Sequence, residues 1–277
     1  MRQKKNFINL LKYEFKIDFR MAGMRYLFCC FIIIFIICLL MHHSYQSGEQ
    51  VQFWDLYMEL WEGIPEYVKG RTSCFKLPVL IMLTQTIILF LIGNIPKQGM
   101  KGYGRFEFIY SSRRKWWVSK CMWVFINILL FYMILILMLS LFIIIKEKDI
   151  ELMHLGTSIN YQLIDVSKRV FVLNILLLPI FVSEVLGIIQ TFIGVFFKPI
   201  FGYVVAESII VVSAYKVSPL FIGNYQMMMR NRLFSGKSEI DLTRGTIICF
   251  VLYTVLFICG SFFIKKEDIL ALDELDE

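Results

Sequence analysis

Two carboxylates inside long apolar runs are the residues of this sequence best placed to do chemistry. Glu184 lies in the run 170–197 and Glu207 lies in the run 200–213. An ionised side chain at mid-depth of a bilayer is costly, so such acids face the interior of a helix bundle or a wet cavity. Two roles stay open for them. They contact a transported molecule or a proton, or they form hydrogen bonds that hold helices together.

The sequence lacks the other patterns that commonly mark an active site. It has no G-x-x-x-x-G-K-[ST] loop for nucleotide phosphates, no H-E-x-x-H zinc motif and no G-x-S-x-G nucleophile motif. The three histidines lie in predicted loops without further ligands: His42, His43 and His154. The seven cysteines contain no C-x-x-C pair, and most fall in apolar runs, where cysteine behaves as a small hydrophobic residue. We therefore expect neither a metal site nor a disulfide framework.

The composition places the two acids in an integral membrane protein. Of the 277 residues, 58% are hydrophobic and only 18% are charged, and the mean hydropathy is +0.66. Several runs approach the roughly 20 apolar residues that cross a bilayer core. Lys and Arg accumulate in cytoplasmic loops of membrane proteins, so the net charge of +7 indicates membrane topology and not a nucleic-acid surface.

Six apolar runs predict an all-α fold with six transmembrane helices in a single domain, residues 1–277. The predicted spans are 26–41, 77–95, 121–145, 170–197, 200–213 and 245–264. Residues 1–25 place Ile8, Leu11 and Phe15 on one helical face and basic residues on another, which is typical of an amphipathic helix in the membrane interface. The turn between the fourth and fifth spans is Lys198-Pro199.

The distribution of basic residues predicts the orientation of these spans. With both termini in the cytoplasm, the inner segments 1–25, 97–120, Lys198 and the tail 265–277 hold 17 of the 29 Lys and Arg residues. Short basic segments near the start of the chain dominate orientation, so we predict a multi-pass protein of the plasma membrane with both termini cytoplasmic. The segment 214–244 is too polar to cross the membrane. It is predicted to form re-entrant or interfacial helices on the outside, although its basic residues count against that side.

The outer loop 42–76 contains a short helical pattern. Trp54 and Trp61 lie on one face of it, and Asp55 and Glu59 lie on another. We expect a helix anchored by its aromatic residues on the outer surface, with a solvated acidic face. A docking site for a cationic substrate such as a peptide is the alternative interpretation.

The loop 97–120 is the longest charge-rich segment of one sign between two spans. It holds seven bases and a single acid, Glu107, so it is predicted to stay in the cytoplasm. Three apolar residues recur at helical spacing within it: Phe106, Ile109 and Tyr110. These features predict a short amphipathic helix that contacts a cytosolic partner. Trp116 and Trp117, just before the next span, are predicted to mark the bilayer interface.

Three stretches of the sequence resemble the permease subunits of ATP-binding-cassette exporters of the ABC-2 type. In that family an amphipathic helix precedes six spans, and a coupling helix between spans two and three carries Glu-Phe, Ser-Arg and a following Lys. The matching residues here are Glu107, Phe108, Ser112, Arg113 and Lys120. The chain end FFIKKEDI is similar to the family's closing signature through Asp268 and Ile269, and LLKYEFKIDFR is similar to its opening helix. Ser111 stands where the family usually has a proline.

The resemblance implies a permease that is not itself an enzyme and holds no cofactor. A separate cytosolic ABC ATP-binding subunit would carry ATP and Mg, and a second permease subunit, identical or homologous, would complete the path through the lipid bilayer. No nucleic acid is involved. The implied ATPase-coupling residues are Phe106, Glu107, Phe108, Ile109, Tyr110, Ser112, Arg113 and Arg114, and the candidate residues of the transport path are Glu184 and Glu207. The small chain favours a peptide, bacteriocin or drug as substrate.

Two other classes of function stay open. The first is a membrane-embedded enzyme that uses Glu184 and Glu207 as acid and base, although no His, Asp or metal cluster accompanies them. The second is a non-transporting sensor or scaffold whose basic loop recruits a cytosolic partner.

Overall fold

The computed structural model is helical throughout and describes residues 23–42, 52–66, 75–93, 112–147, 168–235 and 238–266. Four helices within these ranges are long and apolar enough to cross a membrane: Gly23–His42, α6 (Arg113–Glu147), α7 (Lys168–Phe196) and α10 (Leu242–Lys266). They make the chain a membrane protein and agree with predicted spans one, three, four and six. The predicted interfacial helix up to residue 22 and the tail from residue 267 lie outside the described residues.

Two further apolar helices are shorter than a usual span. α3 (Val79–Ile92) has 14 residues and α8 (Pro199–Tyr215) has 17. At about 1.5 Å per residue they measure roughly 21 and 26 Å, against about 30 Å for the hydrocarbon core of a bilayer. They occupy the places of predicted spans two and five. The structure therefore shows the helical class and four spans, and the six-span arrangement stays a prediction.

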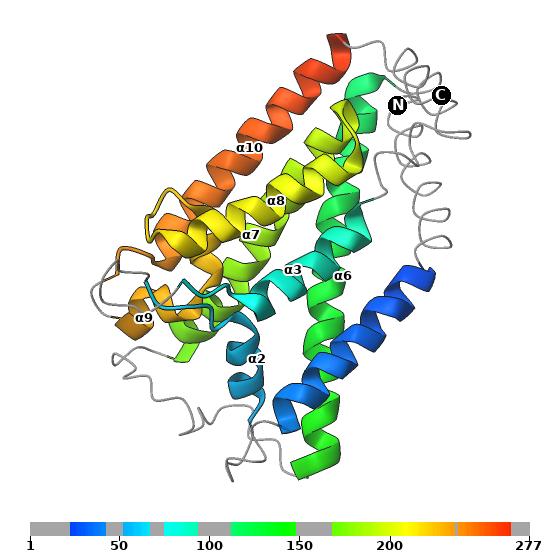
Figure 1. Cartoon of the computed structure of the whole chain (residues 1–277). Helices are drawn as coiled ribbons and strands as arrows, with labels where there is room; N and C mark the ends of the chain where they lie inside the picture. The colour runs from blue at the N-terminus through cyan, green and yellow to red at the C-terminus, as the bar shows by residue number, and fades with distance from the viewer. Residues whose placement is uncertain are drawn as a thin grey trace.

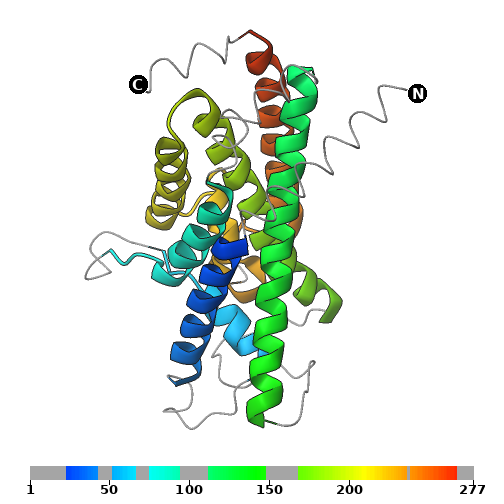
Figure 2. The ribbon, with the colours of Figure 1, turned by 90° about the vertical axis from the view of Figure 1, so that its right-hand side faces the viewer.

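The long helices define two ends of the bundle. Figures 1 and 2 show the beginning of α6 at the same end as the last turns of α10. α7 also ends there, and a short turn leads to Pro199, the first residue of α8. We call this the tryptophan end, because Trp116 and Trp117 are buried there against α7 and α10. The opposite end, the loop end, holds α2 (Phe53–Trp61), η1 (Ile222–Gln226), η2 (Met228–Arg230) and α9 (Arg232–Ser235).

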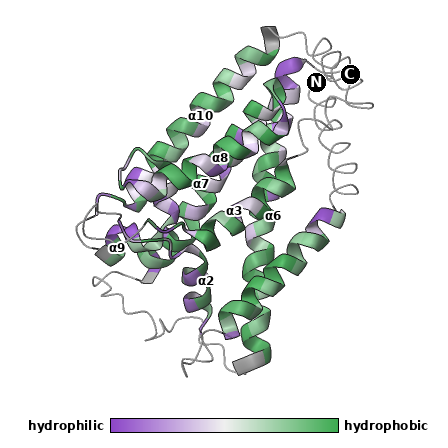
Figure 3. Cartoon of the chain, in the orientation of Figure 1, coloured by the Kyte–Doolittle hydropathy of each residue, from purple (hydrophilic) through white to green (hydrophobic). Residues whose placement is uncertain are grey.

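The long helices are mostly hydrophobic, as the colouring in Figure 3 shows, and many of their apolar side chains are exposed. Phe31 and Phe35 of the Gly23–His42 helix are 70% and 58% exposed, and Phe250 of α10 is 70% exposed. Isoleucines on the opposite side of the first helix, such as Ile33 and Ile37, are buried. Helices that are apolar both inside and outside are stable in lipid but not in water. These outer faces therefore meet lipid chains or another membrane subunit.

α2 is packed inside the molecule and does not lie on its surface. Eight of its nine residues are buried, and the ring of Trp54 meets Phe171 of α7 edge-on at 6.2 Å between centroids. Asp55 is also buried, and its carboxylate accepts a hydrogen bond of 3.2 Å from the backbone N–H of Gln52. The expectation of a solvated acidic face is therefore wrong for Asp55, which caps the N-terminus of the helix.

The tryptophan pair is likewise inside the protein, and its predicted depth at the bilayer interface stays a prediction. Trp116 and Trp117 are fully buried, and the indole N–H of Trp117 donates to the carbonyl oxygen of Phe257 in α10 at 2.9 Å. A Cβ atom at Gly260 would collide with the Trp117 ring. Glycine at this position lets α6 and α10 approach closely enough to enclose the indole.

Candidate functional site

A cluster of polar side chains lies inside the bundle, near the middle of α3, α6 and α7. Ser183 of α7 donates to Gln85 Oε1 of α3 at 2.9 Å and lies 2.9 Å from the hydroxyl of Tyr132 in α6. Gln226 of η1 donates through Nε2 to Gln85 Oε1 at 3.1 Å and to Ser183 Oγ at 3.2 Å. All four side chains are buried. We call them the polar centre.

Gln226 reaches the polar centre because η1 folds back into the bundle. All five residues of η1 are buried, and the element packs against α7 and α8. The backbone N–H of Gly223 donates to Ser213 Oγ of α8 at 3.2 Å, and a Cβ at Gly223 would lie only 2.7 Å from that oxygen. Between α8 and α10 the described residues form only the short elements η1, η2 and α9. The re-entrant or interfacial character expected for 214–244 and its placement on the outer side stay predictions.

The polar centre and its neighbour Glu184 retain unused hydrogen-bonding capacity. Among the described residues, Gln85 Nε2, Gln226 Oε1 and both carboxylate oxygens of Glu184 have no hydrogen-bond partner. A buried polar group left unsatisfied costs about 1–3 kcal/mol. Ionisable groups inside a membrane bundle line substrate or ion pathways and proton relays, whereas amides and hydroxyls there also hold helices together. Glu184 follows Ser183, so it points roughly 100° further around α7.

Glu207 belongs to a second polar contact, between α8 and α3. Its Oε1 accepts a hydrogen bond of 2.9 Å from Thr86, whose hydroxyl oxygen also lies 3.1 Å from the hydroxyl of Tyr203. Thr86 follows Gln85 on α3. Thr86 therefore bonds to α8, and Gln85 bonds to α7. Glu184 and Glu207 share no hydrogen-bond partner among the described residues.

Arg230 is a key residue that the sequence analysis did not single out. It lies at the end of η2 and is 4% exposed. Its guanidinium donates to the carbonyl oxygens of Ser213 (2.7 Å), Ala214 (2.7 Å), Ile64 (2.9 Å) and Pro65 (3.3 Å), and to the side-chain oxygen of Asn224. The first two carbonyls belong to the last turn of α8, where a helix leaves its acceptors without backbone partners. No local pattern distinguishes such an arginine from a solvated loop base.

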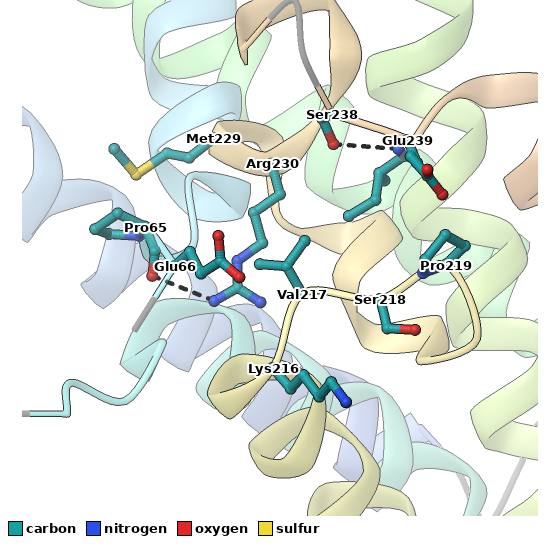
Figure 4. A pocket seen from close by; sticks show the side chains of 11 residues that line it. Pro65, Glu66, Lys216, Val217, Ser218, Pro219, Met229, Arg230, Ser238 and Glu239 are labelled. Carbon is teal, nitrogen blue, oxygen red and sulfur yellow. Dashed lines mark hydrogen bonds between the residues drawn. The ribbon is translucent and has the colours of Figure 1, made fainter. Parts of the chain in front are cut away.

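The charge of Arg230 is preserved despite its burial. Desolvation lowers the pKa of its guanidinium to about 10, and the nearby Glu66 opposes this shift. The group therefore stays protonated at neutral pH. Figure 4 shows the carboxylate of Glu66 beside it.

A pocket of about 540 Å³ opens next to Arg230 at the loop end (Figure 4). Its lining residues are Pro65, Glu66, Lys216, Val217, Ser218, Pro219, Met229, Arg230, Ser238, Glu239 and Ile240. Lys216 and Arg230 are balanced there by Glu66 and Glu239, and Glu239 is paired with Arg244 at 3.2 Å. This mixed wall gives the pocket no preference for a ligand of either charge.

The predicted ATPase-coupling residues fall only partly within the described chain. Five of them lie outside it: Phe106, Glu107, Phe108, Ile109 and Tyr110. The carbonyl oxygen of Ser112 accepts the backbone N–H of Lys115 at 2.8 Å, so α6 begins directly after it. Arg113 is half-buried and Arg114 is exposed, with its guanidinium carbon 5.7 Å from the ring centroid of Phe262 in α10. Helix α6 thus starts within the predicted coupling loop.

Within the described ranges, no three His, Cys, Asp or Glu side chains gather in a way that could hold a metal ion. The six cysteines located there are free: Cys29, Cys30, Cys38, Cys121, Cys249 and Cys259.

No protein-family model matches the sequence, and a search among curated proteins finds no significant match. What can be stated of the chain follows from its residues and geometry. It is a helical membrane protein with a polar centre inside an apolar bundle.

Proposed function

We propose that this chain is the membrane-spanning permease subunit of an ABC-2 type exporter in the plasma membrane. The observation that carries the proposal is the polar centre, which lies midway along helices whose outer faces are apolar. In this proposal α3 and α8 complete a six-span arrangement, with both termini in the cytoplasm. A second permease subunit, identical or homologous, encloses the path, and a separate cytosolic subunit hydrolyses ATP.

The connection between the two polar contacts supports a path for a polar or charged molecule. Gln85 and Thr86 are adjacent on α3, and they bond to Ser183 of α7 and to Glu207 of α8, respectively. Hydrogen-bonding groups therefore extend from α8 across α3 to α7 and α6. A molecule that carries donors could exchange these bonds for its own as it passes, which lowers the cost of leaving water. This chemistry fits a peptide, bacteriocin or drug with basic groups.

The packing at the tryptophan end supports mechanical coupling. Trp116 and Trp117 lie within the first turns of α6 and are enclosed by Ile188 and Val195 of α7 and by Ile264 of α10. Close-packed interiors transmit displacement because they have few voids to absorb it. A movement of the segment before Arg113, imposed by an ATPase, would thus pass to α7, which carries Ser183 and Glu184.

The alternative functions have less support from the geometry. A membrane-embedded enzyme would need Glu184 and Glu207 to act on one substrate, yet no hydrogen bond among the described residues connects the two side chains. A sensor or scaffold explains the basic loop, but it gives no reason to retain unsatisfied amide and carboxylate groups inside the bundle.

The test is capture of the ATP-binding subunit. The tagged chain is purified from its native membranes, the nucleotide-binding protein that accompanies it is identified, and ATP hydrolysis is measured. We expect Phe106→Ala and Arg113→Ala each to weaken the association, since loss of a central anchor commonly costs about 2 kcal/mol, roughly thirtyfold in affinity. Arg232→Ala, an exposed base at the loop end, is the matched control.

Two outcomes would count against the proposal. If no ATP-binding protein accompanies the chain, the transport function loses its energy source. If one does, but Phe106→Ala and Arg113→Ala leave both association and hydrolysis unchanged, the loop 97–120 serves only as a topological signal.

A further inference from the structure

Arg114 is held on the outer surface of the bundle by an aromatic ring. Its guanidinium carbon lies 5.7 Å from the ring centroid of Phe262, within the range of a cation–π contact. Arg114 is exposed, and Phe262 itself is 58% exposed. The guanidinium therefore lies along the seam between α6 and α10 and keeps hydrogen-bond donors available to a molecule outside the protein.

The sequence of α10 fixes the depth of this seam relative to a bilayer. The apolar run of α10 ends at Ile264 and is followed by Lys265 and Lys266. Phe262 and Phe263, 58% and 52% exposed, are the last aromatic residues before that change. Aromatic and basic residues in this order mark the boundary between hydrocarbon and headgroups. Arg114 consequently lies at the level of lipid phosphates.

The described side chains at the tryptophan end are rich in bases. The stretches 112–120, 192–200 and 257–264 contain five bases and no acid, whereas the acids of the tail 267–277 lie outside the described residues. At the loop end, by contrast, the exposed Arg244 in the first turn of α10 pairs with Glu239 of the same chain at 3.2 Å. None of these three stretches supplies an acidic side chain for Arg114 at the seam.

We propose that the seam formed by Arg114 and Phe262 binds the headgroup of an anionic phospholipid. The guanidinium offers parallel N–H donors to two phosphate oxygens, and its stacking on Phe262 orients that fork. The exposed Phe262 ring contacts the glycerol and upper acyl region. The neighbouring bases favour a lipid with net negative charge over a zwitterionic one. This inference requires only that the seam faces a bilayer, so it is independent of the proposed transport function.

The experiment is native mass spectrometry of the full chain in detergent, titrated with phosphatidylglycerol or with phosphatidylcholine. We expect preferential retention of phosphatidylglycerol, weakened about fivefold in Arg114→Gln, as for loss of one basic residue near a membrane surface. Retention of phosphatidylglycerol by Arg114→Lys should lie between that of the unmodified chain and that of Arg114→Gln, because lysine keeps the charge but lacks the parallel N–H donors of the guanidinium. Phe262→Leu should weaken binding without changing the charge. Arg244→Gln is the matched control and should bind as the unmodified chain does.

Three results would overturn the inference. The first is equal retention of the two lipids. The second is equal loss in the Arg114→Gln and Arg244→Gln variants, which would indicate a general charge effect. The third is displacement of the lipid by millimolar inorganic phosphate, which would identify a site for a free anion. Because Arg114 is exposed, its substitution should leave thermal stability unchanged, and that measurement accompanies each variant.

Discussion

At the tryptophan end, α6, α7 and α10 meet through large apolar side chains, whereas the loop end is joined by hydrogen bonds to buried polar groups. Trp116 and Trp117 fill the space between regular helices, and one indole N–H reaches a carbonyl of α10. At the loop end, the guanidinium of Arg230 connects η2, the last turn of α8 and the segment after α2.

The difference follows from the backbone at each end. At the tryptophan end the contacts between helices come mainly from large apolar side chains, which pack by complementary shape. The loop end is built from short 3₁₀ elements and helix termini, which leave carbonyl oxygens without partners. A buried arginine supplies several donors in one plane and satisfies them together. The two ends should therefore fail for different reasons.

The largest expected effect concerns the side of the membrane on which each end lies. In a cysteine-free background, Lys198→Cys marks the tryptophan end and Glu239→Cys marks the loop end. An impermeant thiol reagent added to intact cells should label position 239 and leave position 198 unlabelled until the cells are opened. Both positions are exposed, so access is not limited by the fold. Labelling of position 198 from outside would reverse or abolish the proposed orientation.

The second effect is loss of the buried arginine. Arg230→Met should lower the free energy of unfolding by about 3 kcal/mol or more, because several buried carbonyls each lose a partner at about 1–3 kcal/mol. Unfolding of the purified protein in mixed micelles measures this. Arg232→Met, at an exposed position two residues later, should change stability by less than about 0.5 kcal/mol. Equal effects of the two substitutions would mean that the guanidinium does not hold the loop end together.

The third effect tests how tightly side chains pack at the tryptophan end. Gly260→Ala places a methyl group against the Trp117 ring and should destabilise the protein by about 1–3 kcal/mol, the usual cost of overpacking. Gly23→Ala is the control, because a Cβ there meets no atom within 4 Å. Thermal unfolding monitored by tryptophan fluorescence reports both. A neutral Gly260→Ala variant would show that the contact between α6 and α10 is loose.

The smallest effect concerns the region between the two ends. Glu207→Gln should change the free energy of unfolding by no more than about 0.5 kcal/mol, because the amide oxygen still accepts the hydrogen bond from Thr86. Glu207→Leu removes that acceptor and should cost about 1 kcal/mol. If the Gln variant keeps its stability but loses export, the charge of Glu207 belongs to the transport path. Normal export would leave it a structural contact.

The sequence alone predicted the features that depend on local composition. Apolar runs located the four long helices, since partition into lipid depends on the run itself, although α6 begins eight residues before the predicted span 121–145. The turn at Lys198-Pro199 was also predicted, because proline fits the first position of a helix and interrupts the one before it. Glu184 and Glu207 were found by the same logic, since a charge within an apolar run is visible without a structure.

Only the tertiary structure decided which side chains meet. Asp55 and Trp116 looked like surface and interface residues, yet both are buried by segments distant in sequence. Gln226 and Arg230 occur in a polar stretch that resembles any solvated loop, and their roles arise when η1 and η2 fold against α7 and α8. Burial and hydrogen-bond partners depend on these long-range neighbours, whose positions no local pattern records. The physical reason is that a residue's type fixes what it can bond to, while the fold fixes what lies within reach.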